Sequence, residues 1–233
     1  MNLFYQPSIQ QGIFHLDSTE SKHCTKVLRR KAGDKIHITD GKGFLYEAVI
    51  TVADPVECKF EIQERKIEDV KSFGIHIAIS PTKHPDRLEW FVEKAVELGV
   101  DKITIMNCEH TEPSHYKFER LEKIAISAMK QSLRLTLPNI EGPTDFTTVI
   151  NETSAASKFI AHVDASNTDH LKNIAPPDSV YLVLIGPEGD FSPHELQLAA
   201  AKKFLKVSLG SNRLRTETAG LAVCNILNLV NTP

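Results

Sequence analysis

The sequence lacks the features that mark several large classes of protein. No apolar run approaches the roughly 20 residues that span a bilayer, and residues 1–11 show neither the basic nor the apolar stretch of a signal peptide. The four cysteines are far apart and form no C-x-x-C pair, so we expect free thiols rather than a disulfide framework or a structural zinc site. These absences predict a cytoplasmic protein without a bound metal.

Two nucleotide-binding motifs are also missing. The one G-x-G, at Gly41–Gly43, lies in a turn rather than after a buried strand, which disfavours a Rossmann dehydrogenase or methyltransferase. No G-x-x-x-x-G-K-[ST] is present, which excludes a P-loop enzyme. The net charge of -3 gives no overall attraction to nucleic acid, so any RNA contact must come from a local patch.

The pattern of hydrophobic residues predicts two domains, over 1–70 and 73–233. In the first, apolar and polar residues alternate, which predicts a small barrel or curled sheet, with a helix over 19–28 that has Asp17 or Ser18 as its N-cap. The strands expected there are 35–39, 44–52 and 56–62.

From residue 73 onward, strands alternate with helices, which predicts an α/β domain with a parallel sheet. Its first unit is a βαβ unit whose helix opens with Pro85 and stops at Gly99. The expected helices are 85–98 and 117–133, and the expected strands are 75–79, 102–106, 159–163, 180–185 and 205–209.

A loop with two glycines follows the strand 180–185. Ser192 and Glu195 form a capping box around Pro193, which is a structural feature of the helix that follows. Gly186 and Gly189 instead lie at the carboxyl end of a buried strand, where open α/β sheets bind their ligands. Taken alone, these glycines could equally serve the turn.

A second loop, 210–220, leads from the strand 205–209 into an apolar helix. Arg213, Arg215 and Glu217 crowd this loop, which favours a functional site over a merely solvated loop. The helix over 221–230 is apolar nearly all round, so it must be covered by the core or by another subunit. A dimer interface is therefore expected at this helix.

A basic patch lies in the first domain. The window 22–35 holds six lysines and arginines against one acidic residue, Asp34. With Val27 and Leu28 facing inward, the helix could present these cations to RNA phosphates, although a solvated helical face would have the same composition.

Five segments, in order along nearly the whole chain, resemble the bacterial 16S ribosomal RNA uracil-N3 methyltransferases of the knotted SPOUT class. They are Lys22–Arg29 followed by Ala32–Asp34, Glu93–Val100, Gln131–Arg134, Ile185–Gly189, and Leu209–Gly210 through Leu214–Ala219. The resemblance implies an N-terminal PUA-like β-barrel and a C-terminal SPOUT-type parallel sheet with a trefoil knot. Periodicity alone would not predict a knot, because true knots are nearly absent from proteins.

The resemblance also implies the reaction. S-adenosyl-L-methionine would be the methyl donor, and N3 of one uridine, position 1498 of the 16S rRNA in the small ribosomal subunit, would be the acceptor. The protein would act as a homodimer.

The chemistry of N3 methylation makes Arg215 and Glu217 the catalytic candidates. Arg215 is the candidate for stabilising the uridine anion, and either Glu217 or Glu188 could accept the N3 proton or hold the ribose and the arginine. The implied donor-binding residues are Leu184, Gly186, Glu188, Gly189, Leu209, Gly210, Ser211, Leu214, Thr218 and Ala219. The expected RNA-binding residues are Lys22, Lys26, Arg29, Arg30 and Lys31 of the basic patch, together with Arg134.

Two segments depart from the family pattern. Asp190 stands where the family has a third small residue, and it could tighten the turn or cap the helix. The stretch 107–112 replaces a Ser-Glu-Arg-Ser-like segment, so an RNA-contacting arginine is absent there. His110, Glu112 and His115 lie close in sequence, but neither their spacing nor the chemistry requires a metal.

Two other functions remain compatible with the sequence. A knotted methyltransferase that acts on transfer RNA is the nearest, and only the first domain argues against it. A non-catalytic RNA-binding protein is the second, but it would leave the two loops without a ligand.

Overall fold

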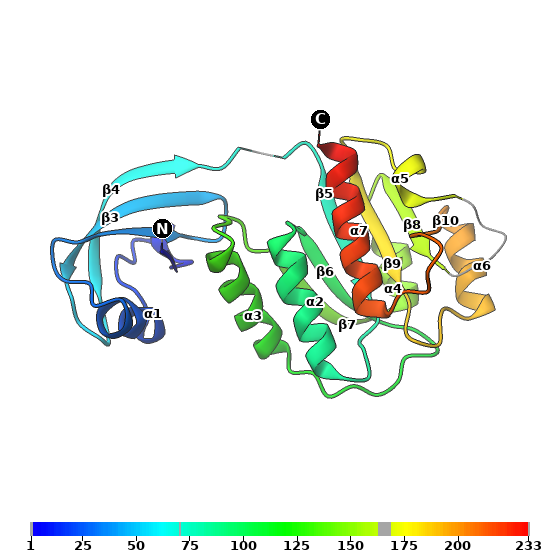
Figure 1. The fold of residues 1–233 in the computed structure, drawn as a ribbon, viewed down its shortest axis with the longest axis horizontal. Coiled ribbons are helices and arrows are strands. Elements are labelled where there is room, and N and C mark those ends of the chain that lie inside the picture. Colours follow the sequence, from blue (N-terminus) through cyan, green and yellow to red (C-terminus); the bar gives the residue numbers. More distant parts are fainter. Residues whose placement is uncertain (1, 70, 163–168, 233) are drawn as a thin grey trace. The chain divides into compact units, whose positions relative to one another are not determined.

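A computed structural model describes residues 2–69, 71–162 and 169–232 (Figure 1). The chain divides into two compact units, which are considered separately: Met1–Val70 with Ile126–Leu137, and Lys71–Ala125 with Pro138–Pro233. Among the described residues, no helix is long and apolar enough to cross a bilayer.

The first unit is built on a four-stranded sheet in the order β1-β2-β3-β4. β1 pairs parallel to β2, and the other neighbours are antiparallel. Alternate side chains of β2 and β3 enter the core, where Ile38 and Ile50 are buried beside Leu16. The strands are Leu3–Tyr5 (β1), Lys35–Thr39 (β2), Phe44–Val52 (β3) and Lys59–Ile67 (β4).

The helical segment of this unit changes character along its length. It begins as the α-helix α1, Ser18–Lys22, where the Asp17 side chain caps the first turn by accepting a hydrogen bond from Glu20 N at 2.8 Å. It continues as a π-helix over His23–Val27. The expectation that Val27 faces inward is wrong: this side chain is 67% exposed, because the wider turn rotates it away from the core.

A segment from later in the chain completes the first unit. The end of α3, Phe118–Gln131, and the residues after it group with the N-terminal strands. Lys130 forms an ion pair with Glu20, and Thr39 Oγ1 donates a hydrogen bond to the Leu135 carbonyl at 2.9 Å. These contacts explain why 126–137 belongs to this unit although the sequence suggested a boundary near residue 70.

The second unit contains a six-stranded sheet in the order β10-β8-β9-β5-β6-β7. Every neighbouring pair is parallel, as the sequence predicted. The strands are Gly74–Ile79 (β5), Lys102–Asn107 (β6), Asn139–Asp145 (β7), Ser157–Ala161 (β8), Val180–Ile185 (β9) and Leu205–Val207 (β10). The predicted strand 159–163 ends at Ala161, and Val163 lies outside the described residues.

Helices cover both faces of this sheet. On one face α2, Pro85–Glu97, packs against α7, Thr216–Asn231 (Figure 1). The two helices approach closely at Gly220, which has no side chain. A Cβ at this position would overlap the Phe91 ring. On the other face the helices cover a cluster of buried side chains that includes Leu182 and Leu184. Those helices are α4, Phe146–Glu152, and α6, Pro193–Ala201, and a short α5, Leu171–Ile174, lies between β8 and β9 along the chain.

Candidate functional site

Three loops converge because three strands are neighbours. β8, β9 and β10 run in the same direction, so their carboxyl ends at Ala161, Ile185 and Val207 meet at one edge of the sheet. A cavity of about 910 Å³ lies there, at the position where open α/β sheets bind their ligands. It is lined by Ala161, His162, His170, Ile185, Gly186, Pro187, Glu188, Asp190, Val207, Ser208, Leu209, Gly210, Ser211, Asn212, Arg213, Leu214, Arg215, Thr216 and Ala219. We call this the first cavity.

The glycines of the first loop lie too close to neighbouring side chains to carry a side chain without a shift of those neighbours. A Cβ at Gly186 would lie 3.0 Å from the Phe191 ring, and one at Gly189 would lie 3.2 Å from His110 Cβ. Gly186 lines the first cavity, whereas Gly189 is not among the residues that line it. Both glycines therefore keep the loop folded against its neighbours.

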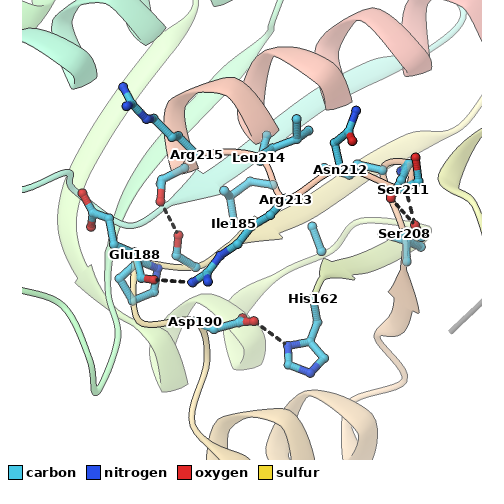
Figure 2. A pocket seen from close by; sticks show the side chains of 18 of the residues that line it. His162, Ile185, Glu188, Asp190, Ser208, Ser211, Asn212, Arg213, Leu214 and Arg215 are labelled. Atoms are coloured by element: carbon cyan, nitrogen blue, oxygen red, sulfur yellow. Dashed lines mark hydrogen bonds and ion pairs between the residues drawn. The ribbon is translucent and has the colours of Figure 1, made fainter. Parts of the chain in front are cut away.

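Asp190 tightens this loop, one of the two roles expected for it. Its backbone is left-handed, with φ of 63°, and its N–H donates to the Pro187 carbonyl at 3.0 Å. One carboxylate oxygen accepts from Phe191 N at 2.8 Å, and the other lies 3.1 Å from His162 Nδ1 (Figure 2). Asp190 thus holds the wall of the first cavity rather than capping α6.

The predicted capping box is confirmed. Ser192 N donates to Glu195 Oε2 at 2.8 Å, and the Ser192 hydroxyl accepts from Glu195 N. The other Glu195 oxygen accepts from Glu109 N at 2.9 Å, which ties the loop after β6 to the start of α6.

The second loop is joined to the first by side chains. Thr216 Oγ1 donates to the Gly186 carbonyl at 3.0 Å, and Arg213 Nη2 lies 3.5 Å from the Glu188 carbonyl. Figure 2 shows Arg213 reaching toward Glu188, while the Arg215 side chain points away from His162 and Asp190. Within the described residues, the Arg215 guanidinium takes part in no hydrogen bond or ion pair.

A second cavity, of about 640 Å³, adjoins the first. Both proposed catalytic residues line it, and Glu217 is buried, with one oxygen 3.9 Å from Arg87 Nε. The residues that line this second cavity are Asp86, Arg87, Trp90, Arg213, Leu214, Arg215, Glu217 and Thr218.

The expected donor-binding and catalytic residues are therefore distributed over two adjoining cavities. The first cavity contains Gly186, Glu188, Leu209, Gly210, Ser211, Leu214 and Ala219 of the expected donor-binding set. Thr218 lines the second cavity instead, and Leu184 is fully buried inside β9. Arg213, Leu214 and Arg215 line both cavities, so the two cavities meet at this segment.

The sequence analysis did not identify Arg87 and Trp90 as site residues, although both line the second cavity. Both lie on α2, far along the chain from the two loops. The sequence pattern could have indicated that Trp90 is exposed, because this residue falls on the polar side of a helix whose apolar side is Leu88, Phe91 and Val92.

The expected RNA-binding residues all belong to the first unit. Lys22, Lys26, Arg29 and Lys31 are exposed, and Arg30 is half-buried. Arg29 has a left-handed backbone with φ of 57°, which turns the chain sharply after the π-helix. Arg134 is half-buried in the segment 126–137.

Burial makes the cysteine thiols unreactive at neutral pH. All four are free, as predicted, and the structure shows that all four are buried. Burial raises the pKa of Cys24 and of Cys224 to about 12, and it also raises the pKa of Cys58 and of Cys108. At neutral pH these thiols stay protonated, so none is a ready nucleophile.

Two of the side chains before α3, His110 and Glu112, have protein partners. His110 Nδ1 lies 3.0 Å from the Asp190 carbonyl, and Glu112 pairs with Lys83 at 2.9 Å. In the described part of the chain, no group of three or more His, Cys, Asp or Glu side chains is placed to hold a metal ion.

Comparison with known families matches this architecture. A family model described as an RNA methyltransferase domain matches residues 70–228, and one described as an RNA methyltransferase PUA domain matches residues 16–63. The chain belongs to this family of RNA methyltransferases.

Solved and curated relatives extend the match over the full length. A "probable rRNA-methyltransferase" of Porphyromonas gingivalis is 43% identical, with a TM-score of 0.90, and the match covers 99% of this chain and 98% of that one. The ribosomal RNA small subunit methyltransferase E of Neisseria gonorrhoeae, solved bound to S-adenosyl methionine, is 27% identical with a TM-score of 0.85 over 99% and 98% of the chains. The Aquifex aeolicus enzyme of the same name is 29% identical over 97% of this chain and 99% of its own.

Proposed function

We propose that this protein transfers the methyl group of S-adenosyl-L-methionine to N3 of a uridine in 16S rRNA of the small ribosomal subunit. The observation that carries the proposal is the pair of adjoining cavities at the carboxyl edge of the sheet. One has the lining expected for the donor, and the other contains both residues expected to act on the base.

The first cavity fits the methyl donor chemically. Ile185, Leu209 and Leu214 offer an apolar surface suited to the adenine ring, and the loop backbone and Ser211 offer hydrogen-bonding groups. Glu188 and Asp190 place carboxylates on the same wall, which suits a ligand that carries a positive charge at sulfur. The bound donor supplies a methyl group already activated by that sulfonium.

The protein's part is to orient the base and to favour its anion. Uracil N3 must lose a proton before it attacks, and the negative charge spreads over the ring carbonyls. Arg215 lies on the wall between the cavities without a protein partner among the described residues, so its guanidinium is available to that charge. Glu217 has Arg87 beside it and serves as the proton acceptor or as the group that holds the arginines.

The inert thiols favour nitrogen as the methylated atom. A uracil ring carbon is a weak nucleophile that needs covalent activation, for which enzymes use a reactive side chain such as a thiolate. The four buried cysteines cannot supply one at neutral pH. Methylation at N3 needs only placement and charge stabilisation, which the site offers.

The basic patch of the first unit provides the grip on RNA. Its exposed lysines and arginines would contact phosphates, which fix the position of the RNA without reading its sequence.

We further propose a homodimer in which the outer face of α7 is covered, because Leu229 there is 58% exposed. A protein with this substrate would work in the cytoplasm, where ribosomal subunits are assembled.

Methyl incorporation from labelled donor tests the proposal. Purified small subunits, free 16S rRNA and transfer RNA from cells lacking the protein would be compared as acceptors. The proposal predicts label in small subunits or 16S rRNA and none in transfer RNA. Label in transfer RNA alone would establish the rival substrate, and the absence of any transfer would contradict the enzymatic function.

A further inference from the structure

We propose that the second cavity is a nucleotide-binding subsite in which Trp90 stacks against the uracil ring that is to be methylated. This inference rests on the proposed function and adds the place from which the base approaches. It assigns a role to Trp90 and Arg87, two residues on α2 outside both motif loops.

The exposure of Trp90 is the first observation. The indole is 45% exposed on a helix whose other large apolar side chains, Leu88 and Phe91, are fully buried. A tryptophan left half open to water beside a cavity of about 640 Å³ offers a flat face of the kind on which unpaired bases stack.

The charge around this indole is the second observation. Arg87, Arg213 and Arg215 line the cavity with it, against Asp86 and Glu217. Glu217 is buried with its oxygen 3.9 Å from Arg87 Nε, and the Arg213 guanidinium reaches toward the Glu188 carbonyl of the first cavity. The exposed Arg215 guanidinium therefore remains to face an anionic ligand. An aromatic face with arginines around it suits a base and its phosphates.

The shared wall is the third observation. Arg213, Leu214 and Arg215 line both cavities, so the two cavities meet at that short segment, and a base in the second would lie next to a donor in the first. The Arg215 side chain points away from His162 and Asp190 of the first cavity (Figure 2). A uridine that has left its stack would then meet the guanidinium on the acceptor side.

A second copy of this chain is the other conceivable occupant. The boundary shared with the first cavity favours RNA, because the base that receives the methyl group must lie beside the donor. The test below makes the second copy an outcome that would overturn the proposal.

Fluorescence gives a direct readout, because Trp90 is the sole tryptophan in the sequence. The wild-type protein, saturated with S-adenosylhomocysteine, would be titrated with transcribed 16S rRNA, which carries no tryptophan of its own. Stacking predicts quenching of the emission along the binding curve measured by filter binding. Full binding with unchanged emission would overturn the proposal.

Kinetics with unmethylated small subunits complete the test. Trp90→Ala should raise the KM for the subunits about tenfold, the loss typical of one base–aromatic contact, without changing the donor Kd. Trp90→Phe should recover most of the loss, since it keeps a ring. Val180→Ala, which trims another exposed apolar side chain at the opposite end of β9, should behave as wild type.

The outcomes separate this inference from the proposed function. Wild-type transfer with an unchanged KM in Trp90→Ala would overturn the subsite and leave the enzyme. A halved molar mass of Trp90→Ala by light scattering, with the kinetic loss, would show that a second copy covers this indole. Quenching by RNA in a protein that transfers no methyl group would support the subsite and contradict the proposed reaction.

Discussion

The two cavities that meet at Leu214 differ in what they offer a ligand. The first is lined by the ends of three strands and the loops that follow them, with the aliphatic Ile185, Leu209 and Leu214 and the carboxylates of Glu188 and Asp190. The second is bounded by arginines, a tryptophan and a buried carboxylate. We expect the carboxylates of the first cavity to favour a positively charged ligand, and the arginines and indole of the second to favour an anionic, aromatic one. Mutations on the two sides of Leu214 should therefore have separable effects.

The largest separation is expected from Arg215→Ala. If the guanidinium stabilises the uridine anion, its help is greatest in the transition state and nearly absent when only the donor is bound. The methylation rate should fall by roughly 100-fold or more, with donor affinity by calorimetry unchanged. Arg215→Lys should rescue only part of the rate, because lysine lacks the planar fork.

Raising the pH provides a control for that assignment. More of the uracil is anionic in alkaline solution, so the defect of Arg215→Ala should shrink as the pH rises. A defect that stays constant across pH, or a variant that binds the donor poorly, would make Arg215 a structural residue and shift the catalytic role toward Glu217.

Gly210→Ala tests the first cavity with an effect that we expect to be about tenfold. Gly210 has φ of 127°, a conformation that side-chain-bearing residues adopt at a cost of roughly 1–3 kcal/mol. The loop should shift and weaken donor binding, while RNA binding stays intact. Gly33→Ala is the matched control, since Gly33 also has a left-handed φ and open space around it but lies in the first unit. Equal loss of donor binding in both variants would point to general destabilisation.

A smaller effect is expected from the basic patch, which lies in neither cavity. Arg29→Ala combined with Arg30→Ala should weaken RNA binding several-fold and reduce the steepness of its salt dependence, because fewer counterions are released. Donor affinity should not change. An RNA affinity that is the same at low and high salt would show that the patch makes no phosphate contacts.

The substitution His76→Gln should leave both cavities unaffected at neutral pH. Burial, reinforced by Lys102, lowers the pKa of His76 from 6.5 to about 4, and its Nε2 lies 2.8 Å from Thr104 Oγ1. The unfolded chain therefore takes up this proton before the folded protein does, so stability should fall by up to roughly 3 kcal/mol as the pH drops from 6.5 to 4. His76→Gln should show a flatter loss by denaturant titration over that range. Equal slopes would mean that His76 titrates normally.

The sequence predicted those elements whose own pattern was strong. β2 and β3 have the predicted bounds because their alternation is regular. α2 ends one residue before the predicted bound, because Pro85 and Gly99 mark its two ends. β7 was missed because Gly142 and Pro143 interrupt it, and β1 because a strand as short as Leu3–Tyr5 has no readable period.

The sequence identified residues that line the cavities where polar and charged side chains gather in one loop, and not where the lining depends on tertiary contact. The motif loops named Gly186 and Arg215 directly, and both line a cavity. Nothing local shows that Glu217 turns toward Arg87, because that pairing depends on the packing of α7 against α2. The knot implied by the resemblance and the exact donor contacts stay predictions.

The chemical position of the new methyl group tests the central claim most directly. Small subunits methylated by the wild-type protein with labelled donor would be digested to nucleosides and separated by liquid chromatography with mass spectrometry. A donor on one side of Leu214 and an arginine-stabilised uracil anion on the other predict label in 3-methyluridine. Label in 5-methyluridine or in a 2′-O-methyl nucleoside would contradict the account, because neither product passes through an anion at N3.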